Sequence, residues 1–315
     1  MRFLLPAEFV KTPGATEETW SLKDSLRYTR WLARTHYENF HVVTFLLPRR
    51  LHQDFFNVYA FCRWADDLGD ETGDPALSLR LLEWWREELR QMYRDQVRHP
   101  VFVALHETVL RHSIPEEPFA DLIRAFVQDQ KVTRYQTYAE LLDYCVYSAN
   151  PVGRLVLHLC GYRDAERRRL SDAACTALQL ANFWQDVTRD LEKGRVYIPL
   201  EDMAAHGYRL EDLECRRYNK NFHELMRELV NRAHILFLEG LPLVEKVDRR
   251  LAVDIELFSR GGLAILEKIR VQDYNVLERR PALDKKDRLL LLGRALWRAG
   301  FGRPTPAVEA ADACR

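Results

Sequence analysis

The chain has 315 residues, and its 47 basic residues balance its 47 acidic residues. This length permits one large domain or two small ones, and no linker or low-complexity stretch divides it. Because there is no net positive charge, a nucleic-acid partner is not predicted. No run of about 18 apolar residues is present, so a membrane-spanning helix is not expected.

Apolar residues recur at spacings of three and four along most of the chain, which predicts an all-α fold. Turn-forming residues separate these periodic segments. The predicted helices cover residues 19–37, 49–71, 76–97, 100–112, 116–131, 137–160, 166–193, 221–240, 242–273 and 284–299. No element is assigned with any clarity between 194 and 219. We therefore predict a single domain over residues 1–315.

The two ends of the chain bear on its location. The first residues, MRFLLPAEFVKTPG, lack the apolar core of a signal peptide, so a cytoplasmic location is expected. The run from 289 to 302, LLLLGRALWRAGFG, is apolar enough to cover a core or to touch a bilayer surface. We expect it to pack on the core, with a peripheral contact to the inner face of the cell membrane as the alternative.

The first candidate site is an acidic pair in the predicted helix 49–71. Asp66 and Asp70 are four residues apart, and Tyr59 and Arg63 continue the same helical face. Apolar residues surround this stripe, so polar side chains stand where leucine is expected in a core-facing helix. The stripe therefore faces either solvent or a functional cavity.

The same acidic spacing recurs at Asp186 and Asp190, on a face that also carries Gln179, Asn182 and Lys193. Like charges four residues apart destabilise a helix by about 0.2–0.5 kcal/mol, so the repetition indicates a compensating cation. Mg²⁺ suits such a site, because it binds a few carboxylates and completes its shell with water and phosphate oxygens. The paired motifs predict a magnesium–diphosphate site, whereas either motif alone is equally consistent with a solvated acidic face.

A third informative segment is YCVYSANPVGRLVL, residues 144–157. Tyr144, Tyr147 and Ser148 share one helical face, and Asn150 and Pro151 then interrupt the helix. A broken helix with tyrosines beside the break can line a cavity and offer hydroxyls to a reacting group. A tyrosine-rich core with one structural kink is the alternative.

Together these segments resemble the squalene/phytoene synthase branch of the trans-isoprenyl diphosphate synthase superfamily. Residues 46–71 are similar to the first aspartate-rich region of that family, 178–199 to its second, and 143–153 to its pocket segment. The resemblance runs from about residue 30 to 280. It implies a single-domain isoprenoid synthase helical bundle with a central cavity.

The resemblance also assigns roles to particular residues. It implies a Mg²⁺ site, with about three ions per diphosphate, held by Asp66, Asp70, Asn182, Asp186 and Asp190. Tyr144 and Arg63 are the catalytic candidates. The implied substrate-binding residues are His36, Phe40, Tyr59, Arg63, Gln179, Asn182, Phe183, Lys193, Arg195 and Tyr274. NADPH is not expected, because the chain has no G-x-G-x-x-G fingerprint, although the squalene synthases it resembles bind NADPH without one.

Three departures from the common family pattern point to one activity. Residues 36–40 read His-Tyr-Glu-Asn-Phe, so Glu38 replaces a cation that faces phosphate in many members. The pocket segment carries Asn150-Pro151, and residues 259–262 stand where many members place an aromatic side chain. This pattern resembles bacterial hopanoid-pathway enzymes that ionise presqualene diphosphate and capture water to give hydroxysqualene. Loss of a cation is consistent with binding one diphosphate instead of two.

Two other functions stay open on the sequence. The first is head-to-head condensation of two allylic diphosphates to squalene, dehydrosqualene or phytoene. The second is a non-catalytic family member that acts as an assembly protein, against which the intact aspartate pairs argue. The expected partners are a prenyl diphosphate and the neighbouring enzymes of the squalene pathway, and a monomer or weak dimer is the expected state.

Overall fold

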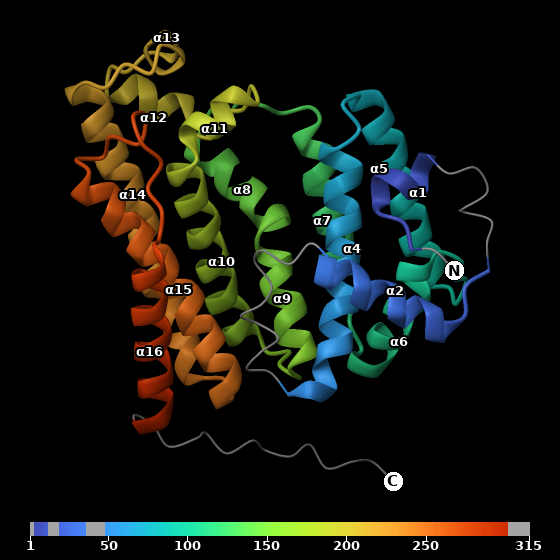
Figure 1. Ribbon diagram of the computed structural model, residues 1–315. Helices are drawn as coiled ribbons and strands as arrows, with labels where there is room; N and C mark the ends of the chain where they lie inside the picture. The colour runs from blue at the N-terminus through green and yellow to red at the C-terminus, as the bar shows by residue number, and fades with distance from the viewer. Residues whose placement is uncertain (1–2, 12–18, 36–47, 302–315) are drawn as a thin grey trace.

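The computed structural model describes residues 3–11, 19–35 and 48–301, the last six as backbone alone (Figure 1). Within these ranges the elements are helices, and the one extended pairing is an isolated bridge between Arg134 and Val196. The all-α prediction is therefore confirmed.

The helices follow one another with short connections. In chain order they are α1 (Pro6–Lys11), α2 (Leu22–Thr35), η1 (Arg49–Leu51), α4 (His52–Asp70), α5 (Pro75–Met92), α6 (Pro100–His112), α7 (Glu117–Asp129), α8 (Tyr138–Ser148), α9 (Asn150–Leu159), α10 (Ala165–Gln185), α11 (Val187–Glu192), α12 (Leu200–Ala205), α13 (Leu210–Glu214), α14 (Lys220–Gly240), η2 (Leu241–Glu245), α15 (Arg249–Val271) and α16 (Lys285–Phe301).

Several predicted helices differ from those observed. The segment 137–160 divides into α8 and α9 at Ala149, where Asn150 and Pro151 start the second helix. The segment 166–193 divides at Asp186, although no proline lies there. The segment 242–273 divides into η2 and α15, and residues 194–219 contain the short helices α12 and α13. Helix α1 was not predicted.

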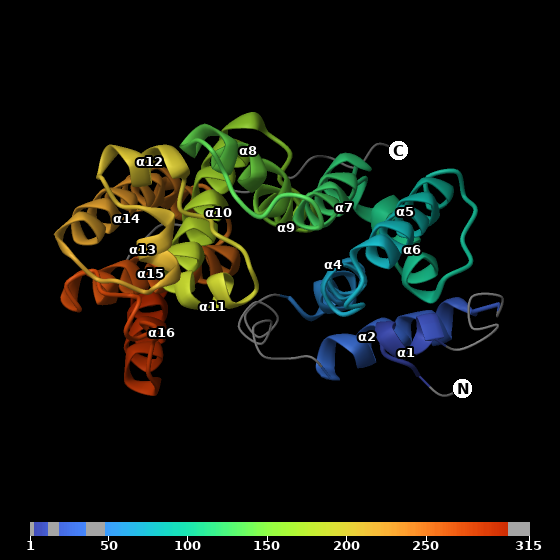
Figure 2. The ribbon, with the colours of Figure 1, turned by 90° about the horizontal axis from the view of Figure 1, so that it is seen from above.

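Helices α7, α8 and α9 connect the two sides of the molecule. On one side α4 packs against α2, α5, α6 and α7, and on the other α10 packs against α14 and α15. Helix α9 contacts both α4 and α10, and Figure 2 shows α7, α8 and α9 between the two groups. The two aspartate motifs are therefore carried by helices whose separation depends on α9.

Close packing fixes α9 against α10. Gly153 lies so near α10 that an added Cβ atom would stand 2.6 Å from Cys175 Sγ and nearer still to Ser171 Oγ. Thr176 on α10 donates a hydrogen bond of 2.9 Å to the buried side chain of Asn150. This hydrogen bond thus joins the start of α9 to α10. The two residues are distant in the sequence and meet only when the helices pack together.

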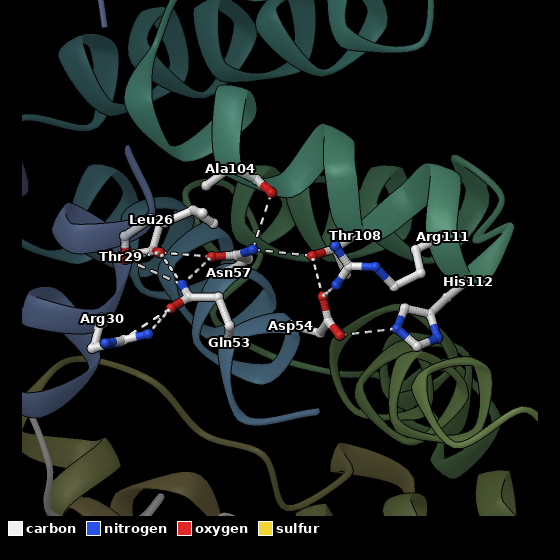
Figure 3. Close-up of polar contacts among 10 residues, drawn as sticks. All are labelled: Leu26, Thr29, Arg30, Gln53, Asp54, Asn57, Ala104, Thr108, Arg111 and His112. Atoms are coloured by element: carbon white, nitrogen blue, oxygen red, sulfur yellow. Dashed lines mark hydrogen bonds and ion pairs between the residues drawn. The ribbon is translucent and has the colours of Figure 1, made fainter. Parts of the chain in front are cut away.

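A buried polar network fixes α4 against α2 and α6 (Figure 3). Asn57 accepts hydrogen bonds from Thr29 at 2.6 Å and from Gln53 at 2.9 Å. Its amide donates to the Ala104 carbonyl and to Thr108, both at 3.0 Å. Buried polar groups that are fully paired hold their elements in one arrangement. Asn57 therefore fixes the positions of α2, α4 and α6 relative to one another.

The same network continues through Asp54 at the start of α4. Asp54 Oδ1 accepts hydrogen bonds from Thr108 and Arg111, at 2.9 and 2.8 Å. Its other oxygen lies 3.0 Å from His112 Nε2 (Figure 3). Because α4 carries the first aspartate motif at its far end, this network helps to determine where that motif lies.

We predict that Asn57→Ala lowers the free energy of unfolding by about 2–4 kcal/mol, because it leaves several buried partners without hydrogen bonds. Urea denaturation followed by circular dichroism would measure the change. The matched control is Asn231→Ala on the exposed side of α14, where one hydrogen bond from Arg270 is lost. A loss no larger than that of the control would contradict the role of the network.

Asp254 on α15 is a buried carboxyl group outside this network. Asp254 is only 2% exposed, and among the described residues neither of its carboxyl oxygens has a hydrogen-bond partner. Burial, with Asp248 nearby, raises its pKa to about 8. The folded state therefore favours the protonated acid, and ionisation costs stability. The free energy of unfolding should fall as pH rises from about 4 to about 8.

Asp254→Asn removes this titration. We compare the free energy of unfolding of the variant with that of the wild type at two pH values. The difference should be roughly 2–4 kcal/mol more favourable to the variant at pH 9 than at pH 5. Denaturant titrations at both pH values would test this, with exposed Asp143→Asn on α8 as the control. An equal difference at pH 5 and pH 9 would show that Asp254 does not titrate in this range.

Within the described side chains of the C-terminal apolar run, residues 289–295, only part is buried, so the expected packing on the core holds for one face of this segment. Leu289 and Leu290 on α16 are 68% and 61% exposed, whereas Ala295 is fully buried. Helix α16 therefore packs through one narrow face and leaves leucines outside. None of the helices in the described ranges is long and apolar enough to cross a bilayer.

Candidate active site

Arg63 organises the first aspartate motif. On the last turns of α4 its guanidinium lies 3.6 Å from Asp66, 2.5 Å from Asp67 and 3.5 Å from Glu71. Asp70, the last residue of α4, is directed elsewhere and remains more than a third exposed. One arginine thus faces three carboxylates.

The first motif carries more negative charge than Arg63 compensates. Burial raises the pKa of Asp67 to about 6, with Arg63 opposing the rise and Glu71 and Asp66 adding to it. Burial also raises the pKa of Asp66, where Arg63 again opposes and Asp70 adds. When neighbouring acids disfavour ionisation of a carboxyl group, an added cation stabilises its ionised form. The motif therefore favours a bound metal ion or a cationic group.

The second motif lies at the break between α10 and α11. Asp186 directly follows the last residue of α10, and Arg280 donates hydrogen bonds to both of its carboxylate oxygens, with Nη2 at 2.9 Å from Oδ2. The neighbouring Gln185 donates to the Pro281 carbonyl at 2.6 Å. A segment more than ninety residues further along the chain therefore binds at the position where α10 breaks.

Asp190 is the carboxylate of the second motif without a close basic partner. Within the described chain its Oδ2 atom is buried and has no hydrogen-bond partner. Burial and the charge of Asp186 raise its pKa to about 6, against the lowering effects of Lys193, Arg195 and Arg280. An acceptor oxygen of this kind is suited to a metal ion or to a metal-bound water.

Arg195 joins the two motifs. Its guanidinium donates a hydrogen bond of 3.2 Å to Asp70 at the end of α4. Lys193 is exposed, and its charge lowers the pKa of Asp66. The segment that follows α11 thus brings two cations to the first motif. The prediction that the two acidic faces approach each other is supported by this contact.

Beside these charges lies a cluster of aromatic rings. Phe183 and Tyr197 stack with centroids 3.8 Å apart and planes 10° apart. Tyr144 lies 6.3 Å from Phe183 and 6.1 Å from Tyr197, and Tyr135 lies 5.5 Å from Tyr144. The rings come from α8, α10 and the segments that flank them. Ring faces of this kind can stabilise a cation by about 0.5–2 kcal/mol each.

The Tyr144 hydroxyl is oriented by a residue that the sequence patterns did not indicate. It donates a hydrogen bond of 3.0 Å to Asp129 Oδ2, at the end of α7. Burial raises the pKa of Asp129 to about 6, while the bond from Tyr144 and the charge of Arg195 lower it. Asp129 is a single acid with no second acid at helical spacing, so no sequence pattern indicated it. Arg280 was missed because its partner, Asp186, lies far from it in the chain.

The remaining predicted residues are distributed as follows. Tyr59 is half-buried near Arg63 and Asp66, because both charges act on its pKa, which burial raises. Gln179 is half-buried on α10, and Asn182 is exposed on the same helix. Tyr274 packs edge-on against the His223 ring, with centroids 4.9 Å apart. His36 and Phe40 lie outside the described residues.

The donor set fits Mg²⁺ in kind, although the carboxylates are spread apart. Among the described residues no three carboxylate, imidazole or thiol groups converge closely enough to form a complete metal centre. Mg²⁺ commonly uses one or two carboxylates and takes its other ligands from water and substrate phosphates. Asp66, Asp70 and Asp190, with the orphaned Oδ2 atom of Asp190, offer such ligands. Ligation of Mg²⁺ by these residues remains a prediction.

Comparison with known proteins identifies the family. The family model for squalene/phytoene synthases matches residues 33–287. The phytoene synthase of Thermus thermophilus is 34% identical over 296 residues, covering 93% of this chain and 97% of its own. That of Arthrospira platensis is 29% identical over 292 residues, covering 88% and 94%. The chain belongs to the squalene/phytoene synthase family.

Solved structures agree with this assignment. Squalene synthase HpnC from Alicyclobacillus acidocaldarius superposes with a TM-score of 0.78 and 46% identity, over 81% of this chain and 96% of its own. A dehydrosqualene synthase in complex with a ligand superposes with a TM-score of 0.76 at 24% identity, over 89% and 98%. The second likeness concerns the fold alone. The predicted isoprenoid synthase helical bundle is confirmed.

Proposed function

We propose that this member of the squalene/phytoene synthase family ionises presqualene diphosphate with Mg²⁺ and captures water to give hydroxysqualene. The observation that carries the proposal is the junction at Arg195, where the two aspartate motifs meet beside the Tyr144 ring cluster. One side of this junction is charged and suits a diphosphate, and the other is aromatic and suits a carbocation.

The relatives support the chemistry at a coarser level. A squalene synthase shares 46% of aligned residues with this chain, and a phytoene synthase shares 34%. Both names describe enzymes that work on prenyl substrates. The narrower choice of presqualene diphosphate rests on Glu38 and Asn150-Pro151, of which Glu38 lies outside the described residues.

The arginines bind the leaving group in the proposed reaction. Bound Mg²⁺ supplies Lewis acidity that neutralises charge on the departing diphosphate. Arg63 and Arg195 now rest on carboxylates, at 3.6 Å from Asp66 and 3.2 Å from Asp70. When those acids ligate a cation, the guanidinium groups can turn to phosphate oxygens, which they match in geometry. Arg280 is likewise paired with a candidate metal-binding carboxylate, that of Asp186.

The ring cluster protects the cation after ionisation. Faces of Tyr144, Phe183 and Tyr197 can lower its energy while it rearranges. These rings are at most 9% exposed, so bulk water does not reach their faces. A single ordered water can then capture the cation, and the alcohol forms. NADPH has no part in this sequence, because no hydride is transferred.

We predict that Asp66→Asn or Asp186→Asn lowers turnover about 10²-fold or more, since each substitution removes preorganised charge. Steady-state assays over a range of Mg²⁺ concentrations would measure the effect. Unfolding free energy should not fall for Asp66→Asn, because burial and neighbouring acids already raise the pKa of this carboxyl. The matched control is Asp143→Asn, an exposed acid on α8. Near-normal turnover with unchanged Mg²⁺ dependence in both variants would count decisively against the role.

Substrate choice is tested by direct incubation. The purified protein with presqualene diphosphate and Mg²⁺, without NADPH, should give an alcohol one oxygen atom heavier than squalene by mass spectrometry. Farnesyl diphosphate alone should give little or no product. Inactivity with every prenyl diphosphate would instead favour an assembly protein.

Head-to-head condensation is the second candidate, and the relatives named squalene and phytoene synthase favour it. It predicts efficient conversion of farnesyl diphosphate to presqualene diphosphate or squalene, or of a C20 diphosphate to phytoene. The paired-aspartate site would serve that reaction equally well. Such a result would overturn the hydroxysqualene proposal and the interpretation of residues 36–40 and 148–153.

A further inference from the structure

Asp129 is a half-buried acid in contact with the ring cluster through Tyr144, and none of the proposed diphosphate chemistry uses it. It ends α7, and its Oδ2 atom accepts the Tyr144 hydroxyl at 3.0 Å. Its Oδ1 atom is buried and has no hydrogen-bond partner within the described residues. A buried carboxylate oxygen without a partner costs free energy, so it needs a reason to persist.

The hydrogen bond to Asp129 also orients Tyr144. A phenol has one hydrogen, and Tyr144 directs it to Asp129, so the lone pairs of its oxygen point away from that bond. Tyr144 can therefore act toward a third group only as an acceptor. Asp129 Oδ1 is likewise an acceptor when the acid is ionised. Two acceptor oxygens thus lie side by side at the edge of the aromatic cluster.

The residues around these two acceptor oxygens determine which molecule can bind to them. The rings of Tyr135, Phe183 and Tyr197 lie around Tyr144, with the Phe183 centroid 6.3 Å from it. Arg195 donates a hydrogen bond to Asp70, and its charge also lowers the pKa of Asp129. A water molecule needs two to four polar partners to be held in a buried site. A water that donates one hydrogen to each acceptor keeps an oxygen lone pair free.

We propose that Asp129 and Tyr144 together hold the water that captures the carbocation, and that Asp129 is the general base of this step. This inference rests on the proposed function. The water oxygen forms the new C–O bond with the cation, one of its O–H bonds breaks, and that proton passes to Asp129 Oδ1. The products are the neutral alcohol and a protonated Asp129, which returns the proton to solvent after release. Charge and atoms balance without any further reactant.

Asp129→Asn tests the proposal with little change of shape. The amide can still accept the Tyr144 hydrogen but cannot take the proton. With presqualene diphosphate and Mg²⁺ in ¹⁸O-labelled water, diphosphate release should stay within about tenfold of the wild type. The labelled alcohol per substrate consumed should fall at least tenfold, and hydrocarbons formed by proton loss should replace it. A purely structural role would lower all products together.

Two further variants complete the test. Tyr144→Phe removes one acceptor and should shift the products in the same direction, so the proposal stays testable if Asp129→Asn fails to fold. Asp121→Asn, on the same helix but paired with Arg154 at 3.7 Å, should leave the product ratio unchanged. Thermal unfolding of each variant checks its fold.

The outcomes separate this inference from the function on which it rests. If the wild type makes no labelled alcohol, the proposed function fails and the inference fails with it. If the wild type makes labelled alcohol and the ratio is unchanged in Asp129→Asn, or in Tyr144→Phe should the first variant not fold, the inference alone is overturned.

Discussion

The repulsion between carboxylates gathered from two helices is the constraint on which the rest of this structure depends. Asp66, Asp67 and Asp70 end α4, and Asp186 and Asp190 flank the break after α10. Burial, with a smaller contribution from neighbouring acids, raises the pKa values of Asp66, Asp67 and Asp190 and so works against their ionisation. Arginines reduce that cost, and each comes from a different place in the chain. In the proposed function, Mg²⁺ would bind these carboxylates and the guanidinium groups would bind the diphosphate.

Supporting this charged junction requires rigid elements around it. The network through Asn57 holds α4 against α2 and α6, and Gly153 lets α9 approach α10 closely. Because α9 contacts both α4 and α10, the separation of the acidic motifs follows from this packing. Apolar burial supplies the bulk of the stabilisation, while the buried polar groups select one arrangement of the helices.

Sequence patterns predicted what is local and missed what is long-range. The 3.6-residue period located most helices, and the repeated acidic spacing located both motifs, because each signal lies within one turn or two. The division of α10 and α11 was missed, since no proline marks it and its partners, Arg280 and Pro281, lie far along the chain. Asp129 was missed because its meaning depends on Tyr144 fifteen residues later, on another helix. Tyr197 lies in the segment 194–219, to which the sequence assigned no clear element, so the stacking of its ring on Phe183 was not predicted.

The pairing of Arg280 with Asp186 can form only late in the synthesis of the chain. The helices that carry both acidic motifs leave the ribosome well before residue 280 does. Until that arginine emerges, Asp186 lacks its bidentate partner and the end of α10 lacks the segment that binds at its break. The nascent chain therefore passes through an interval in which both acidic motifs have been synthesised and the arginine that pairs with Asp186 has not.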